Sequence, residues 1–322
     1  MGDYPLLAWY GVSSYNPFKL RETPAMTAPK RIHQMTLPQW EKAFPTEDAC
    51  AAYLIHHRWP LGIRCPRCGL EADNPVGGRT FKWACYGCNP NGYQFSHIAG
   101  TIFENTNKPL RDWFRVIHRM LVSKKGVSAL QMYREMGFGS YKTAWYMCHR
   151  VRAGLANEDF RKLMGVVEVD ETYIGGKKHN KHGRHDGKRG PTGKIAVVGA
   201  VERKGNVVAR VIHGISKEGL QSFVHEVVST DVSLLATDEH RGYVGLADFY
   251  PHKSVRHSSG NYVVGAIHTN TIEGFWSLIK RSIVGSYHKV SRKYLPLYVA
   301  EAQFRYNNRM NPDIFGEAIR GC

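Results

Sequence analysis

Two Cys-x-x-Cys pairs constrain the fold of this chain more than any other feature of its sequence. Cys65 and Cys68 form the first pair and Cys85 and Cys88 the second, and 16 residues separate the two pairs. This spacing is typical of zinc sites, in which four thiolates bind one tetrahedral Zn²⁺ and the intervening segment forms a hairpin. Because four protein ligands leave no coordination position for water, the pattern predicts a structural zinc. A coincidental set of redox-active or free thiols is the alternative.

The charge of the chain indicates a polyanionic partner. Its 44 Lys and Arg residues exceed its 27 Asp and Glu residues, which gives a formal net charge of +17 and a pI of about 9.6. A basic balance of this size is expected of proteins that bind nucleic acid. A ribosomal or membrane-surface protein is the alternative, but an aromatic content of 11% and many apolar runs disfavour a disordered basic tail.

The sequence shows no signal for a membrane or for export. No stretch approaches the roughly 18 consecutive apolar residues of a membrane helix, and no basic segment followed by an apolar one opens the chain. We therefore expect a soluble cytoplasmic protein without a membrane partner, in which paired cysteines bind metal and do not form disulfides. We interpret the other cysteines, Cys50, Cys148 and Cys322, as buried or incidental thiols.

The composition and the spacing of apolar residues change along the chain, and these changes predict four regions. They are a poorly ordered arm at 1–34, a helix plus zinc ribbon at 35–105, a helix-turn-helix domain at 106–160 and an α/β domain at 161–315. The arm mixes Pro, Gly, Ser and Tyr without a sustained period, whereas one helical pattern begins at Leu37 and leads into the first cysteine pair. Helical spacing of apolar residues between Pro109 and Arg152 predicts three helices joined by short turns.

The last region has the order of elements found in ribonuclease-H-like folds. Strand and helix patterns follow one another as β-β-β-α-β-β-α, at 166–174, 194–203, 206–213, 217–228, 234–238, around Val255 and from about Asn270 in one long helix. A tight Lys204-Gly205 turn joins the second and third strands into a hairpin. The predicted fold class is therefore α/β, with a ribonuclease-H-like mixed-sheet core preceded by a small zinc ribbon and a helix-turn-helix.

The segment from Gly126 to Arg152 has the pattern of a helix-turn-helix. Ser128 is typical of a helix N-cap, and the region of Gly137 is typical of the turn before a second helix. That second helix carries polar and basic side chains suited to base edges and phosphates. The predicted DNA contacts here are Lys142, Thr143, His149, Arg150 and Arg152. A helical hairpin that only packs against the rest of the protein is the alternative.

Three acidic residues from separate elements predict a site for two metal ions. Asp170 lies within a strand pattern, where an aspartate is disfavoured unless it binds something, and Asp238 closes a strand at the end where α/β proteins gather ligands. Glu273 lies on another face of its helix than the apolar residues, together with Ser277 and Lys280, so it can face the strands. Two Mg²⁺ or Mn²⁺ ions about 3.5 to 4 Å apart need shared carboxylate ligands of this kind.

Other charged residues near these acids have two interpretations each. We interpret Glu168, Glu171 and Glu239 as bystanders, because a lone carboxylate is usually solvated. Lys280, two helical turns after Glu273, is positioned to hold a phosphate, and a lysine that complements the helix dipole is the alternative. The remaining predicted phosphate contacts are Lys177 and Lys178, in a loop between strands, and Arg281.

Eight segments together carry a resemblance to a known family. They are the two cysteine pairs, Gly100-Thr-Ile-Phe, Lys125-Gly-Val-Ser-Ala, Lys142-Thr-Ala-Trp, Val169-Asp-Glu-Thr-Tyr-Ile-Gly-Gly, Thr237-Asp-Glu and Asn270-Thr-Ile-Glu-Gly-Phe-Trp. In these segments the chain resembles the zinc-ribbon transposases of bacterial insertion sequences, prokaryotic relatives of the eukaryotic Merlin elements. The resemblance extends from about Met35 to the Phe304-Arg-Tyr-Asn-Asn-Arg309 segment.

The resemblance implies a ribonuclease-H-like catalytic core with Asp170, Asp238 and Glu273 as its acidic triad and Lys280 as the accompanying basic residue. In parts of that family an asparagine takes the place of the third acid, so Asn270 is an alternative to Glu273. The implied function is a DNA transposase that binds transposon ends, cleaves them and joins them to target DNA in a Mg-dependent reaction. We expect a dimer or larger assembly on double-stranded DNA, at the nucleoid of a bacterial cytoplasm.

Two other functions remain open from the sequence. A sequence-specific DNA-binding regulator would use the zinc ribbon and the helix-turn-helix with an inactive core. A structure-specific nuclease would cut DNA without joining it. The grouped acids disfavour the regulator, because a protein that only binds a polyanion does not need them.

Overall fold

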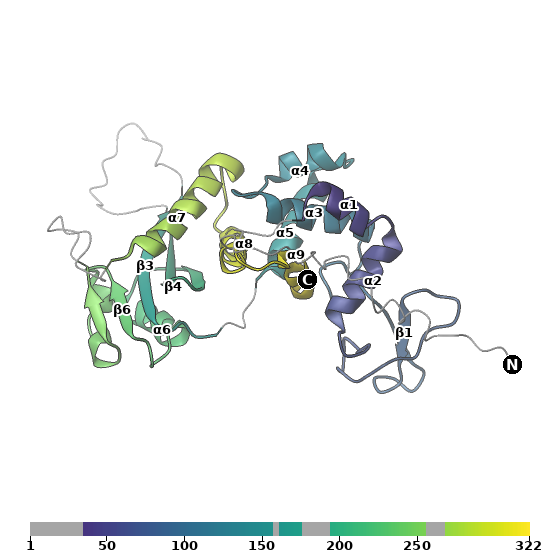
Figure 1. Ribbon diagram of the computed structural model, residues 1–322, viewed down its shortest axis with the longest axis horizontal. Helices are drawn as coiled ribbons and strands as arrows, with labels where there is room; N and C mark the ends of the chain where they lie inside the picture. The colour runs from purple at the N-terminus through teal and green to yellow at the C-terminus, as the bar shows by residue number, and fades with distance from the viewer. Residues whose placement is uncertain (1–34, 157–160, 176–193, 256–267) are drawn as a thin grey trace, which may run out of the picture.

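Figure 1 shows the computed structural model, which describes residues 35–156, 161–175, 194–255 and 268–322. A helical body with a small ribbon and an α/β body lie side by side, and the C-terminal helices connect them. The predicted arm at 1–34 lies outside the described residues. Among the described helices, none is both long and apolar enough to cross a bilayer.

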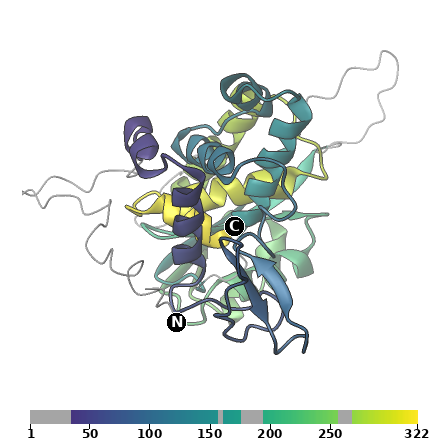
Figure 2. The ribbon, with the colours of Figure 1, turned by 90° about the vertical axis from the view of Figure 1, so that its right-hand side faces the viewer.

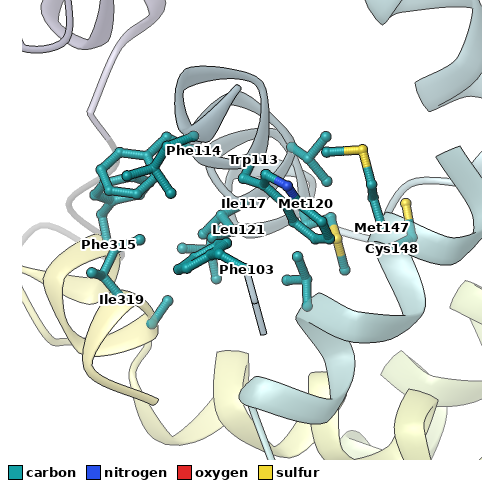
Figure 3. Packing of buried hydrophobic residues seen from close by; sticks show 14 of the residues in the cluster. Phe103, Trp113, Phe114, Ile117, Met120, Leu121, Met147, Cys148, Phe315 and Ile319 are labelled. Atoms are coloured by element: carbon teal, nitrogen blue, oxygen red, sulfur yellow. The ribbon is translucent and has the colours of Figure 1, made fainter. Parts of the chain in front are cut away.

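The helical body is built around one buried cluster. Its helices are α1 (Leu37–Ala43), α2 (Glu47–Arg58), α3 (Leu110–Val122), α4 (Ala129–Met136), α5 (Tyr141–Gly154) and α9 (Ile314–Gly321). Figure 3 shows Phe114 and Ile117 of α3 packed toward Phe315 and Ile319 of α9, and the rings of Phe114 and Phe315 are 5.6 Å apart. The C-terminus therefore belongs to the helical body, as Figure 2 also shows. The same cluster includes residues of α1 and α2, so one core crosses the boundary that we expected between residues 105 and 106.

Local sequence explains where these helices begin and end. The prediction of a single helix from Leu37 was wrong, because the structure has two, and the side chains of Thr36 and Thr46 cap one helix each. The three helices predicted between Pro109 and Arg152 are α3, α4 and α5. Ser128 caps α4 as predicted, and Gly137 ends it with a left-handed conformation at φ 63°.

The ribbon consists of two short strands and the cysteine-bearing turns beside them. Strands β1 (Lys82–Cys85) and β2 (Tyr93–Ser96) pair in antiparallel register. Their apolar side chains join a small cluster that includes Ile63 and Phe95. Because this cluster is small, burial of apolar surface alone gives the ribbon little stability.

The α/β body contains a five-stranded mixed sheet in the order β5-β4-β3-β6-β7. The strands are β3 (Val166–Ile174), β4 (Ile195–Glu202), β5 (Val207–Ile212), β6 (Leu234–Thr237) and β7 (His252–Ser254). The first three are antiparallel, whereas β6 pairs in parallel with β3 and β7 in parallel with β6. This is the strand order of a ribonuclease-H-like core and confirms the predicted α/β fold class with its mixed-sheet core.

Helices cover both faces of this sheet. Helix α6 (Lys217–Val227) packs on one face, while α7 (Asn270–Ser282) and α8 (Leu295–Asn307) pack on the other. The prediction of one long helix from Asn270 was wrong, because a π-helical turn, η5 (Ile283–Tyr287), ends α7. Pro296 at the first turn of α8 favours the start of a new helix.

Candidate active site and metal centres

Two aspartates meet because β3 and β6 are parallel neighbours. Their register pairs Glu168 with Ala236. Two residues further along both strands, this register places Asp170 beside Asp238, which directly follows β6. The structure therefore brings together the first two acids of the predicted triad.

Glu171 is the third carboxylate at this point. One oxygen each from Asp170, Glu171 and Asp238 lies within 4.8 Å of the others, and we name these three residues the acid cluster. The Tyr243 hydroxyl donates to Glu171 Oε2 at 2.6 Å, and Tyr243 is only 1% exposed, so this bond holds the carboxylate in place. Glu171, whose side chain is 7% exposed, is therefore not the solvated carboxylate that we expected. Neighbouring side chains on a strand point to opposite faces, but β3 continues past the end of β6, where carboxylates from both faces approach one point.

The acid cluster is electrostatically suited to a cation. Burial, followed by the charges of Glu171 and Asp238, raises the pKa of Asp170 to about 7. The indole Nε1–H of Trp276 donates to Asp170 Oδ2 at 3.0 Å and opposes this rise in the pKa. Burial also raises the pKa of Glu171, although the bond from Tyr243 lowers it. Ionised carboxylates this close repel one another, and hard oxygen donors fit a divalent cation such as Mg²⁺ or Mn²⁺.

The acid cluster borders a cleft of about 640 Å³ beside α7. The cleft is lined by Asp170, Glu171, Thr172, Glu273, Trp276, Ser277, Lys280, Arg281 and Val284. The predicted acid Glu273 and the predicted phosphate contacts Lys280 and Arg281 therefore share one cleft with Asp170. All three of these α7 side chains are exposed.

Glu273 lines the cleft without joining the acid cluster. Its carboxylate accepts a hydrogen bond from Thr269 Oγ1 at 3.1 Å. The alternative third ligand, Asn270, is exposed at the start of α7 and is not among the described residues that line the cleft.

Trp276 reaches Asp170 because the neighbouring strand has no side chain in the way. Gly199 on β4 pairs with Asp170, and a Cβ at Gly199 would lie 2.6 Å from Trp276 Cη2. The helical periodicity of the sequence places Trp276 only on the apolar face of its helix. A tryptophan at the edge of that face, one turn after Glu273, was the available signal for a polar role.

The four cysteines of the ribbon converge as their spacing predicts. The Sγ atoms of Cys65 and Cys88 are 3.5 Å apart, those of Cys68 and Cys85 are 3.6 Å apart, and all four lie within 4.8 Å of one another. Four sulfurs at about 2.3 Å from one tetrahedral ion would be roughly 3.8 Å apart. Gly69, at φ 72°, donates its N–H to the Cys65 carbonyl at 2.9 Å and closes the first turn. The donor set and its geometry fit a tetrahedral metal ion.

Two of the predicted DNA contacts on α5 are buried inside the protein. Arg152 is 1% exposed and pairs with Glu301 of α8 at 2.7 Å, whereas His149 is 7% exposed and stacks on Trp145 at 4.0 Å. The prediction that these two side chains face DNA was wrong, because α8 packs on the C-terminal half of α5.

The other predicted DNA contacts differ in their surroundings. Lys142 is exposed and Thr143 is half-buried, both in the first turn of α5. Arg150 donates from Nη1 to the Glu104 carbonyl at 3.1 Å, so its guanidinium is partly occupied. Lys177 and Lys178 lie outside the described residues.

The sheet order, the acid cluster at the junction of β3 and β6, and the adjacent cleft define a polynucleotidyl transferase with a ribonuclease-H-like core. Residues 162–307 match the family described as "ISXO2-like transposase domain", and residues 45–91 match "Transposase zinc-ribbon domain". Both matched families are domains of insertion-sequence transposases, so the chain carries a DDE transposase domain and a transposase zinc ribbon, and its function is that of a DNA transposase.

A relative and a solved structure are similar to this chain. A Halobacterium salinarum protein named "Uncharacterized protein in transposable element ISH50" is 28% identical over 281 residues, which covers 82% of this chain and 92% of that protein. The solved structure is a chain of the simian T-cell lymphotropic virus intasome in complex with PP2A regulatory subunit B56 gamma. Its sequence identity to this chain is 14% and the TM-score is 0.28. The match covers 60% of this chain and 65% of the intasome chain, which is less than two thirds of that chain's length. A likeness this low adds nothing to the assignment.

Proposed function

We propose that the chain binds the ends of its transposon and cuts and joins DNA with two Mg²⁺ or Mn²⁺ ions held at the acid cluster. The observation that carries this proposal is the pair Asp170 and Asp238, in register on neighbouring parallel strands beside an open cleft. Asp170, Glu171 and Asp238 would hold such ions, which would activate water and stabilise the negative charge that develops on the phosphodiester.

We assign the third acid of the triad to Glu273, and Glu171 is an additional ligand. Glu273 is favoured over Asn270 because it lines the cleft that contains Asp170. Glu273 accepts a hydrogen bond from Thr269, but the Glu273 side chain is exposed. Rotation about its side-chain torsions can therefore turn its carboxylate toward the acid cluster. Glu171 is favoured as a ligand by its oxygen in the acid cluster.

The other residues of the cleft bind and orient. Trp276 fixes one oxygen of Asp170, and an oxygen of this carboxylate lies within 4.8 Å of oxygens from Glu171 and Asp238, where a cation would bind. Lys280 and Arg281 contact the phosphates of the DNA strand in the cleft, since both line it and both are exposed. With activated water as the first nucleophile and a 3′-hydroxyl as the second, the reaction requires no covalent bond to the protein.

The rest of the chain binds and arranges the DNA. The four cysteines hold a structural Zn²⁺, and the zinc ribbon and the exposed end of α5 around Lys142 contact the transposon end. Cutting and joining require two ends in one complex, so the active form is a dimer or larger assembly on double-stranded DNA. Because the substrate is chromosomal DNA, we place this reaction at the nucleoid of the cytoplasm.

A strand-transfer assay tests the proposal. End-labelled DNA that carries the terminal sequence of the element is incubated with protein, Mg²⁺ and a target plasmid. Wild type should give labelled target, and Asp170→Ala should reduce this product by at least about 10³-fold, because the metal ligands act as a unit. The neighbouring variant Glu239→Ala is the control and should stay near wild type, since Glu239 is exposed and outside the acid cluster.

The same assay separates the alternatives. Cut ends without labelled target would indicate a nuclease. End-specific binding with neither product would indicate a regulator with an inactive core. An Asp170→Ala protein that still cuts would contradict the assignment of the acids.

A further inference from the structure

Glu168 is a fully buried carboxylate that the proposed chemistry does not use. It lies on β3 and is 0% exposed. Its Oε1 accepts from Arg203 Nε at 2.6 Å and from Thr271 Oγ1 at 2.9 Å. Its Oε2 accepts from the backbone N–H groups of Thr271 at 2.8 Å and Ile272 at 3.1 Å. With these bonds and no exposure, Glu168 is not available as a metal ligand.

These bonds place the carboxylate at the N-terminus of α7. The first N–H groups of a helix have no partner within the helix, and a side chain at the N-cap usually supplies one. In α7 the N-cap residue Thr269 makes no such bond, since its hydroxyl donates to Glu273 instead. The cap is therefore supplied from the sheet, and its negative charge also complements the helix dipole.

The position of this cap connects it to the active site. Glu168 precedes Asp170 by two residues on β3, so both side chains lie on the face of the sheet that α7 covers. The first turn of α7, which Glu168 holds, also carries Glu273. One strand thus presents Asp170 and also fixes the helix that presents Glu273.

We propose that Glu168 is a positioning residue that anchors the N-terminus of α7 to β3 and so sets the distance between Asp170 and Glu273. This inference rests on the proposed roles of those two acids. A buried ion pair with Arg203 that only stabilises the sheet is the competing explanation. The two explanations predict different effects of losing Glu168. A positioning role predicts changes at α7 and the metal site, whereas a purely structural role predicts destabilisation throughout the α/β body.

Two variants of the full-length protein test this role, with a third as control. Glu168→Gln keeps the shape of the side chain but removes its charge and turns one acceptor into a donor. Thr271→Val removes only the hydroxyl bond and keeps the backbone donor, so it is the milder change. The control is Glu226→Gln, which breaks an exposed carboxylate–arginine pair with Arg210 on the opposite side of the sheet.

Three measurements are made on each protein: amide hydrogen exchange at α7, the midpoint of Mn²⁺ binding by electron paramagnetic resonance, and strand-transfer rates. Glu168→Gln should expose the amides of Thr271 and Ile272 to exchange and raise the Mn²⁺ midpoint by about 10- to 100-fold, as loss of a group that orients ligands does. Thr271→Val should raise the midpoint by about 2- to 10-fold, the effect of one hydrogen bond. In both, kcat at limiting Mn²⁺ should fall, KM for DNA should not change, and saturating Mn²⁺ should restore kcat.

Two results would overturn the proposal. One is a Mn²⁺ midpoint within about twofold of wild type in both variants. The other is faster exchange throughout β4 and β5 in Glu168→Gln, together with an unchanged midpoint in Thr271→Val, because that pattern indicates a general structural role. Wild-type protein that binds Mn²⁺ at the acid cluster but joins no DNA would refute the proposed function alone, since exchange and Mn²⁺ binding still measure the role of Glu168.

Discussion

Asp170 occupies a site that does not suit its own charge. The carboxylate is largely buried beside two other acids, and these surroundings raise its pKa to about 7. Without a cation, its ionised form destabilises the folded protein, because the unfolded chain exposes the same group to water. The active site therefore has a stability cost that metal binding offsets.

This cost predicts a pH-dependent effect of Asp170→Asn on stability. The folded-state pKa of about 7 exceeds the ordinary value of 3.8, so the folded protein holds this proton more tightly than the unfolded chain. The stability from this group is complete below pH 3.8 and is lost as pH rises through about 7. Without Mg²⁺ or Mn²⁺, Asp170→Asn should melt above wild type at about pH 8 and close to wild type at about pH 4. Thermal denaturation at both pH values measures this, and an equal difference at both would contradict it.

A second residue-scale prediction concerns Gly199, whose lack of a side chain leaves space for the Trp276 ring. Gly199→Ala would place a methyl group against the indole ring, so we expect a loss of about 1–3 kcal/mol in stability from overpacking and a lower strand-transfer rate. Gly274→Ala, on the helix α7 that carries Trp276, is the control, because nothing lies within 4 Å of the position that its Cβ would take. It should stabilise the protein by about 0.5–1 kcal/mol. Urea denaturation compares the two, and equal stabilities would show that Trp276 is not tightly packed against β4.

From the sequence, individual residues of the site could be predicted more accurately than the partners that surround them in the fold. Asp170 and Asp238 could be predicted because each is a carboxylate at an unusual place in an apolar strand. The place of Glu171 beside them could not be predicted, since the bond that holds its carboxylate comes from Tyr243, which lies 72 residues away in the chain. Arg152 was mistaken for a DNA contact because its partner, Glu301, is 149 residues distant. Patterns of spacing report on neighbours along the chain and carry no information about such partners.

At the scale of elements, strands and helices with a clear period could be predicted closely. The limits predicted for β3 are those of the structure, because pairs of strand-forming residues, Val166-Val167 and Tyr173-Ile174, mark its two ends. Breaks within helical patterns were missed at Pro45 and at η5, where the apolar spacing continues past a change of direction. The ribbon is a different case, since its short strands were predicted through the cysteines that hold them.

The ribbon should therefore depend on its metal, while the sheet should not. Its own apolar cluster is small, so removal of Zn²⁺ with a strong chelator, or Cys68→Ser, should unfold residues 63–96. The sheet shares no described strand pairing with the ribbon and should keep its protection. Hydrogen exchange followed by mass spectrometry measures both regions in one experiment. A ribbon that stays protected after metal analysis shows no zinc would contradict the structural role of the ion.

At the scale of the whole molecule, a buried ionic junction joins the two bodies. Arg152 of α5 and Glu301 of α8 are each 1% exposed and 2.7 Å apart. The Tyr287 hydroxyl, in the turn that ends α7, donates to Glu301 at 3.1 Å. A Cβ at Gly126, before α4, would collide with that hydroxyl. The helix that carries Glu273 and Lys280 is thus fixed, through its C-terminal turn, to the helices proposed to contact DNA.

Loss of one partner at this junction should destabilise the whole protein. Arg152 holds the pKa of Glu301 below its ordinary value although burial opposes this, so Glu301 is ionised at neutral pH. Glu301→Gln leaves the Arg152 charge buried and should reduce stability by about 3–5 kcal/mol. Glu317→Gln, which breaks an exposed pair with Arg320, is the control and should change stability by at most about 1 kcal/mol.

A double variant tests whether the junction is needed for orientation as well as for stability. Replacing both partners, as Arg152→Met with Glu301→Leu, removes the fully buried charge of Arg152. Arg305, which also pairs with Glu301 at 3.7 Å, is 14% exposed and keeps its bond to the Ser123 carbonyl, so the double variant should recover most of the stability lost in Glu301→Gln. The Tyr287 hydroxyl then has no acceptor at Glu301, so the end of α7 is no longer fixed to α5. We therefore expect the double variant to unfold near wild type in urea, yet to join transposon ends to target DNA more slowly. Wild-type joining by a stable double variant would show that packing alone sets the arrangement of the two bodies.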